Sequence, residues 1–188
     1  MLNLRRKILC LTFYFLEFFS LKSRFVHCFY LKWIGEIFVD EFHMAHVTNQ
    51  DVVLHIGCGS LPTMSILCAQ EGHAKVVAID NNLQAVQRAQ RFIDKQNLSD
   101  AITVKQGDGA TYPVGSFDVI FIAINVNPID VVFRHLATHA NQQVRIICRD
   151  LGTGLVQMLQ DEEFSRHFKI QTQVRHEKTY SLLITKKN

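Results

Sequence analysis

A glycine turn and an acidic residue are spaced along this sequence in a way that suits a nucleotide-like ligand. The turn, Gly57-Cys58-Gly59, follows the apolar run of residues 52–56 and precedes a helical segment. Glycine has no Cβ, so the backbone can turn tightly and approach a ligand closely. Asp80 ends a second apolar run 23 positions after Gly57, about where a carboxylate meets ribose hydroxyls. The spacing predicts a nucleotide-binding βαβ unit, and a tight turn without a ligand is the alternative.

The elements that must position these residues alternate between apolar runs and helical periodicities. The link between the last two apolar runs is so short that they must pair antiparallel. The pattern predicts an α/β fold with a seven-stranded, mostly parallel Rossmann-like sheet, helices on both faces and a C-terminal antiparallel hairpin. The expected strands are residues 52–56, 75–79, 101–105, 117–122, 144–148, 168–175 and 180–185. Helices are expected over residues 63–70 and 155–164. Two more are expected between them, one capped by Asn81 or Asn82 and one that begins at Asn127-Pro128.

Composition indicates a globular protein of the reducing cytosol. Hydrophobic residues make up 48% of the 188 positions and charged residues 20%, as in ordinary folded domains. A net charge of +3 is too small and too scattered to indicate a nucleic-acid partner. The five cysteines are odd in number and form no C-x-x-C pair, which argues against a disulfide framework or a zinc site. We therefore expect a cytoplasmic location and no bound metal, with Cys58 a small filler of the turn in preference to a reactive thiol.

The N-terminal segment, residues 1–49, differs in character from the domain expected over residues 50–188. Its apolar run of residues 8–16 follows a basic start but is far shorter than the roughly 20 residues that span a bilayer. Residues 22–42 read as an amphipathic helix with a wide apolar face, so the segment is expected to form a helical cover. That face must be buried against the domain, against a second subunit in a homodimer, or on a membrane surface.

The glycine turn, Asp80, Gly107-Asp108-Gly109 and the run of residues 117–120 together resemble the class I S-adenosylmethionine (SAM)-dependent methyltransferases. A nicotinamide dehydrogenase shares the first two features but normally adds a sixth parallel strand and a substrate domain, for which this chain is too short. The resemblance implies SAM as co-substrate. It places Gly57, Cys58 and Gly59 under the methionine part of SAM, Asp80 at the ribose, and Asp108, beside Gly109, at the exocyclic amine of adenine. Asn81 and Leu83 can flank the adenine or pack the loop. The reacting carbon is expected near the end of the fourth strand, at Ala123. His55 departs from the family, which usually has an acid there, and we expect it to hold the turn by a hydrogen bond.

A narrower likeness is carried by the continuation of the glycine turn, Leu61-Pro62 and Ser65-Ile66. This loop is similar to that of nicotianamine synthases, which share the fold but transfer the aminocarboxypropyl group of SAM. By that resemblance Glu41 falls about where the synthases carry an acid that meets the amine of the acceptor. The synthases have a larger helical N-terminal region and a tyrosine near the loop that is not evident here.

Candidate acceptor-side residues gather at the expected ends of the fourth and fifth strands. Asn125 can orient an acceptor by hydrogen bonds, or it can shape the loop, and Glu41 is the second catalytic candidate. Arg149 and Asp150 follow the fifth strand and are expected to face the same crevice, where they contact an acceptor or form an ordinary ion pair. His43 and His46 lack a third metal ligand.

Three functions follow from these observations. The first is a SAM-dependent methyltransferase acting on a small-molecule acceptor, without nucleic acid. The second is an aminocarboxypropyl transferase like nicotianamine synthase, making a metal chelator. The third is a SAM-binding or scaffold protein without catalysis. Nothing in the sequence identifies the acceptor or the oligomeric state.

Overall fold

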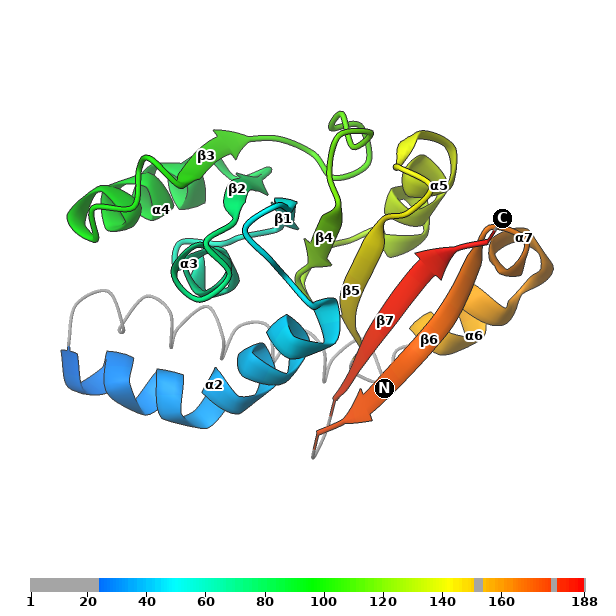
Figure 1. Cartoon of the computed structure of the whole chain (residues 1–188), viewed down its shortest axis with the longest axis horizontal. Coiled ribbons are helices and arrows are strands. Elements are labelled where there is room, and N and C mark those ends of the chain that lie inside the picture. The colour runs from blue at the N-terminus through cyan, green and yellow to red at the C-terminus, as the bar shows by residue number, and fades with distance from the viewer. Residues whose placement is uncertain (1–23, 151–153, 177–178, 188) are drawn as a thin grey trace.

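The computed structural model describes residues 24–150, 154–176 and 179–187, and its centre is one twisted sheet (Figure 1). Seven strands lie in the order β3-β2-β1-β4-β5-β7-β6. All neighbours are parallel except β7, which is antiparallel to both β5 and β6, as the short final link predicted. The strands are β1 (Val52–Ile56), β2 (Lys75–Asp80), β3 (Ile102–Gln106), β4 (Val119–Ile122), β5 (Arg145–Asp150), β6 (Phe168–Arg175) and β7 (Tyr180–Lys186).

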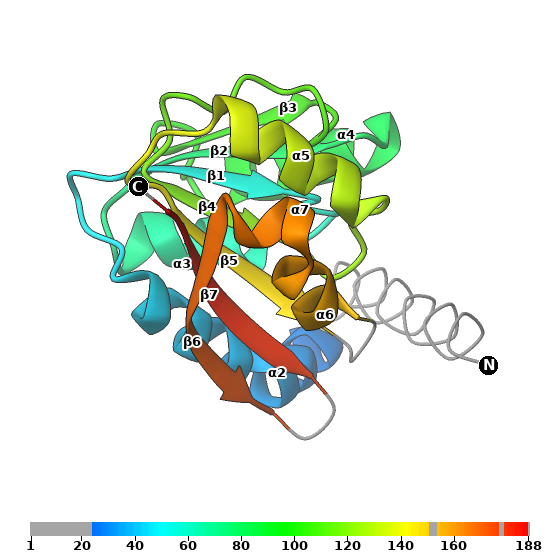
Figure 2. The same cartoon turned by 90° about the vertical axis from the view of Figure 1, so that its right-hand side faces the viewer.

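Helices bury both faces of the sheet, because successive strand residues point to opposite sides. In β1, Val53 joins a core cluster with α2, α3 and α4, whereas Leu54 joins a second cluster with α5, α6 and α7. In Figure 2, α2 and α3 lie below strands β1 and β2 and α5 lies above them. The helices are α2 (Arg24–Ala45), α3 (Thr63–Gln70), α4 (Leu83–Lys95), α5 (Ile129–His139), α6 (Leu155–Gln160) and α7 (Glu162–Ser165). The predicted Rossmann-like fold is confirmed.

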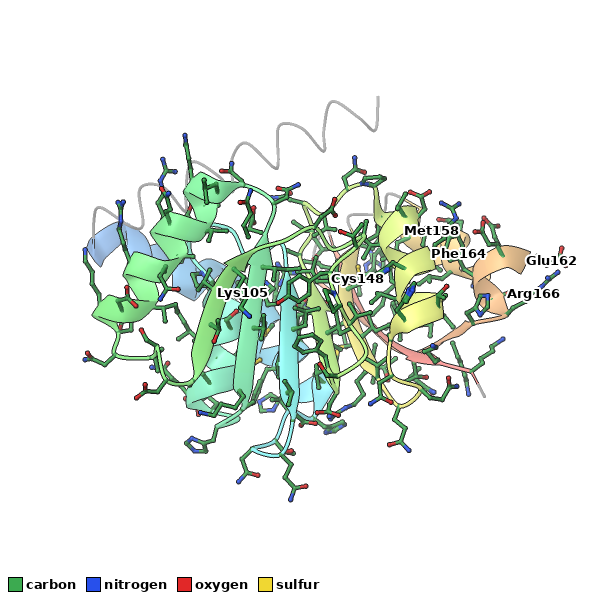
Figure 3. The ribbon with its side chains drawn as sticks, turned by 90° about the horizontal axis from the view of Figure 1, so that it is seen from above. Lys105, Cys148, Met158, Glu162, Phe164 and Arg166 are labelled. Carbon is green, nitrogen blue, oxygen red and sulfur yellow. The ribbon has the colours of Figure 1, made fainter. Side chains whose placement is uncertain are left out.

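One predicted helix, residues 155–164, is instead two short helices broken at Asp161. The backbone of Asp161 is extended, with φ −61° and ψ 151°. In a continuous helix Phe164 would lie about 140° around the axis from Leu159. The break lets Leu159 and Phe164 enter the same core. Figure 3 shows Phe164 near Met158 of α6, while the ion pair of Glu162 and Arg166 lies at the outer edge.

Helix α2 lies beside α3 and along one face of the sheet (Figures 1 and 2). Its C-terminal end is fastened by Arg145, whose Nη1 donates to the carbonyls of Ala45 (2.7 Å) and His46 (2.8 Å). Nη2 of the same guanidinium pairs with Asp51. The end of α2 is therefore fixed to the starts of β1 and β5.

The predictions for the first 23 residues lie outside the described residues. The expected amphipathic helix does correspond to α2, and its side chains are described from Gly35 onward. Among the helices that the structure describes, none is long and apolar enough to cross a membrane. Homodimer or membrane-surface contact through the apolar face stays a prediction.

Candidate functional site

The glycine turn is held against the neighbouring strand β2. The N–H groups of Gly57 and Cys58 both donate to the carbonyl of Ile79, at 2.8 and 3.0 Å. Gly57 has φ +77°, and a Cβ built on it would lie 2.6 Å from Cγ2 of Val126. An L-residue with a side chain is strained at this φ, and valine's branched side chain has little freedom to move away. Glycine is therefore required at this position by both backbone and space.

The Asp80 carboxylate closes the loop from the other side. Oδ2 accepts from the N–H of Gly59 at 2.9 Å, and Oδ1 accepts from the N–H of Asn82 at 2.9 Å. An ionised carboxylate offers about four acceptor positions. The N–H groups of Gly59 and Asn82 occupy two of these acceptor positions on Asp80. The two that remain are enough to accept hydrogen bonds from two ribose hydroxyls.

The adenine-side candidates lie at the ends of β2 and β3. Of the two asparagines, Asn82 caps α4 by accepting from the N–H groups of Gln84 (2.9 Å) and Ala85 (3.3 Å). Asn81 is exposed beside it. Asp108 is also exposed, and its Oδ1 accepts from Ala110 N–H at 2.9 Å. Its second oxygen is oriented by this turn, an arrangement suited to a donor such as an exocyclic amine.

One cleft of about 550 Å³ lies at the carboxyl ends of the parallel strands. A parallel sheet normally binds its ligand at this end, and the volume falls in the usual range for ligand sites. All ten predicted site residues line it: Glu41, Gly57, Cys58, Gly59, Asp80, Asn81, Asp108, Gly109, Ala123 and Asn125. Their contacts with SAM stay a prediction.

Glu41 reaches this cleft from α2 and forms a buried ion pair with Arg149 of β5. Oε1 accepts from Arg149 Nε at 2.8 Å and Oε2 from Nη2 at 2.7 Å. The two side chains are only 6% and 9% exposed. The Arg149 guanidinium also lies 4.8 Å from the centre of the Phe38 ring. Of the two interpretations left open for Arg149, the ion pair is the one observed, and it stands on the cleft wall.

Asp150 does not face the cleft, and that expectation was wrong. Adjacent strand residues point to opposite faces, so Arg149 lines the cleft of about 550 Å³ and Asp150 does not, although both border a second pocket of about 20 Å³ beside it. Asp150 is buried, with 3% exposure, and is not among the residues that line the cleft.

Ser181 contacts the cleft residue Glu41 from behind the cleft wall, and the sequence did not predict it. It is the antiparallel partner of Arg149 in β7, which places both side chains on one face. Its hydroxyl donates to Glu41 Oε1 at 2.7 Å, and its residue is fully buried. A lone serine in the apolar run of residues 180–184 was the available signal.

His55 lies under the glycine turn, and its contact is with α3. Its Nδ1 is 2.9 Å from Ser65 Oγ, and both residues are buried. Burial lowers the pKa of His55 from 6.5 to about 4; the charge of Glu41 raises it slightly and Arg149 lowers it. The ring is therefore neutral at physiological pH and joins β1 to α3 by a hydrogen bond. The sequence predicted such a bond, although to the turn and not to the helix.

This neutral histidine predicts a loss of stability in mild acid. The folded pKa is below the unfolded one, so between pH 6.5 and 4 the unfolded chain binds more protons at this site. The contribution is complete above pH 6.5 and is lost as the pH falls toward 4. We expect the free energy of unfolding to fall by about 2 kcal/mol from pH 6.5 to 5, at 1.36 kcal/mol per pKa unit. Urea denaturation of wild type and His55→Asn at both pH values measures it. The variant should show a smaller decrease, and equal decreases would contradict the assignment.

Two histidines were considered as possible metal ligands. His43 and His46 are exposed at the end of α2. Across the described ranges, no three histidine, cysteine, aspartate or glutamate side chains converge as metal ligands do. Cys58 is buried within the loop, in keeping with the filler role.

Comparison with known proteins identifies the class to which this fold and cleft belong. Residues 31–187 match the family described as ribosomal protein L11 methyltransferase (PrmA). The chain therefore belongs to this family of SAM-dependent methyltransferases.

A curated relative is the ribosomal protein arginine N-methyltransferase rmt3 of Schizosaccharomyces pombe. It is 35% identical over 81 residues, which are 42% of this chain. The chain spans about 14% of the length of that protein.

Solved structures share the fold at low identity. A mutant of the nicotianamine synthase MtNAS in complex with SAM superposes with a TM-score of 0.82 and 22% identity, over 98% of this chain and 77% of the other. The ribosomal protein L11 methylase of Lactobacillus delbrueckii subsp. bulgaricus gives 0.70 and 20%, over 83% and 80%. An RNA methyltransferase of Salinibacter ruber in complex with S-adenosylhomocysteine gives 0.65 and 16%, over 80% and 90%.

Proposed function

We propose that this protein transfers the methyl group of SAM to a small molecule that carries an amine. The observation that carries the proposal is the buried Glu41 carboxylate on the cleft wall. Oε1 already accepts from Arg149 and Ser181, whereas among the residues that the structure describes Oε2 has one donor, Arg149 Nη2. A carboxylate oxygen accepts two hydrogen bonds, so Oε2 has a position for an N–H donor of the acceptor. Because Glu41 is almost closed off from solvent, an acceptor small enough to enter the cleft suits it best.

The remaining cleft residues fit SAM, the methyl donor. The Asp80 carboxylate has two acceptor positions for the ribose, and the glycine turn leaves room for the methionine part of SAM against the backbone. Asp108 follows β3 and lines the same cleft, which supports its predicted hydrogen bond with the adenine amine.

The reaction depends mainly on how the amine and SAM are aligned in the cleft. The uncharged amine attacks the methyl carbon as the carbon–sulfur bond breaks, so the sulfonium becomes a neutral thioether and the nitrogen gains its positive charge. An in-line displacement of this kind is accelerated when the enzyme holds the amine nitrogen in line with the methyl carbon and sulfur of SAM. Glu41 stabilises the charge that develops on the nitrogen, and Asn125, at the loop after β4, is placed to orient the acceptor.

Transfer of the aminocarboxypropyl group is the second candidate, and one observation favours it. The match to MtNAS extends over 98% of this chain with a TM-score of 0.82, whereas the RNA methyltransferase and the L11 methylase match 80% and 83% of it with TM-scores of 0.65 and 0.70. A related crystal structure holds MtNAS with MTA and tNA. Relatives named for ribosomal proteins make a protein acceptor a further outcome to test.

Product analysis separates these functions. The full chain is incubated with SAM and, in turn, amino acids, polyamines and ribosomal protein L11, and the nucleoside product is identified by mass spectrometry. Methyl transfer leaves S-adenosylhomocysteine, and we expect it with a small amine. Methylthioadenosine would establish the aminocarboxypropyl reaction instead. Turnover with L11 alone would overturn the small-molecule acceptor, and no SAM binding by calorimetry would overturn both transferase functions.

A further inference from the structure

The C-terminal hairpin contributes a chain of hydrogen bonds that ends on the cleft carboxylate. Ser181 Oγ donates to Glu41 Oε1 at 2.7 Å, and His176 Nε2 lies 3.2 Å from the same Ser181 oxygen. On the far side of the ring, Nδ1 of His176 is 3.8 Å from Asp40 Oδ2 on α2. Two hydrogen bonds thus lead from His176 through Ser181 to the buried Glu41 carboxylate, and the half-exposed Asp40 carboxylate lies beyond hydrogen-bond distance of the ring.

The direction of these bonds follows from the number of hydrogens. A serine hydroxyl has one hydrogen, and a carboxylate only accepts. The Ser181 hydrogen is therefore used on Glu41, so the hydrogen in the serine–histidine contact must come from His176 Nε2. This defines the ring tautomer. Nδ1 then faces Asp40, and the Nε2–H bond to Ser181 is the same whether or not Nδ1 carries a proton.

We infer that Ser181 and His176 are positioning residues, which hold the Glu41 carboxylate so that Oε2 faces the acceptor. The inference rests on the proposed acceptor role of Glu41. Arg149 donates to both carboxylate oxygens and fixes the plane of the carboxylate, but it gives Oε1 and Oε2 one donor each. Ser181 adds a second donor to Oε1 only, so Oε2 keeps the position for the acceptor. His176 fixes the direction of the Ser181 hydroxyl, since a hydroxyl hydrogen otherwise rotates to any acceptor.

Kinetics of matched variants test this role. Ser181→Ala should raise the acceptor KM about tenfold, the effect of one hydrogen bond to a charged group, while the Kd for SAM stays within about twofold. Ser181→Thr keeps the hydroxyl and should restore most of the loss. His176→Leu should give about a threefold increase, since it acts one bond further away, and His176→Gln, which keeps an N–H donor, a smaller one. Ser116→Ala, at an exposed turn before β4, is the control. Equal acceptor KM values for Ser181→Ala and wild type would overturn the inference.

Two spectroscopic measurements decide the inference even if no acceptor turns over. Nitrogen-15 NMR of the full chain should show His176 protonated at Nε2, and a ring protonated only at Nδ1 would contradict the chain of bonds. The Arg149 Nε–H signal should exchange faster with solvent in Ser181→Ala than in Ser181→Thr and wild type. Equal exchange in all three would overturn the positioning role, whereas absence of turnover in wild type would overturn only the proposed function.

Discussion

Replacing Asp80 by alanine should weaken SAM binding about a hundredfold or more. The carboxylate has two acceptor positions beyond those used by Gly59 and Asn82. Two charge-assisted hydrogen bonds to ribose are worth about 1.5–3 kcal/mol each, and every 1.4 kcal/mol is a factor of ten in affinity. The same change removes the acceptor for the Gly59 N–H, so the glycine turn also loses its brace. Loss of the ribose bonds and loss of the Gly59 brace both weaken SAM binding, and isothermal titration calorimetry with SAM measures their sum.

A second variant separates the ribose bonds from the brace. Asp80→Asn keeps an oxygen that can accept from one loop N–H, but its amide offers fewer acceptor positions and no charge. We expect an affinity between those of alanine and wild type. Asp100→Ala is the control, because that side chain is exposed in the turn before β3. If alanine at position 80 binds SAM like wild type, the ribose lies elsewhere in the cleft.

The parts of the site that local sequence could predict are those made within one βα unit. A strand, its following turn and the next strand end are set by apolar runs and glycines, so the glycine turn and Asp80 could be placed relative to each other from spacing alone. The predicted bounds of β1, α3 and β6 agree with the structure for the same reason. In β1 the sheet buries Val53, Leu54 and Ile56, whereas in the edge strand β6 only Phe168 is fully buried.

The acceptor side could not be predicted in this way, because its members are distant in the chain. Glu41 is 108 positions from Arg149 and 140 from Ser181. Their meeting depends on the order of strands in the sheet and on the register between β5 and β7. A slip of one residue in that register would turn Ser181 to the other face. The same alternation explains why Asp150 was misplaced: its neighbour Arg149 takes the cleft side.

Removal of Glu41 should cost more stability than removal of any exposed charge in this protein. Its partner Arg149 is 9% exposed, so Glu41→Ala removes the carboxylate that accepts two hydrogen bonds from a buried guanidinium. Breaking a buried ion pair from one side typically lowers the free energy of unfolding by about 3–5 kcal/mol. By contrast, the exposed pair of Arg134 and Glu163 has side chains 49% and 54% exposed, and such pairs contribute at most about 1 kcal/mol. Urea denaturation of Glu41→Ala and Glu163→Ala compares the two directly.

A double-mutant cycle then separates the ion pair from the burial of its members. Glu41→Met together with Arg149→Met places apolar side chains of similar length in the same space, and should recover most of the stability lost by either single change. The coupling energy is expected at about 2–4 kcal/mol. Such a result would mean that the fold does not require the charges, since an apolar pair would serve as well. The charges of Glu41 and Arg149 would then be available for the proposed binding of a polar acceptor. Additive single effects would instead show that Glu41 and Arg149 stabilise the fold independently, and would contradict the expected coupling.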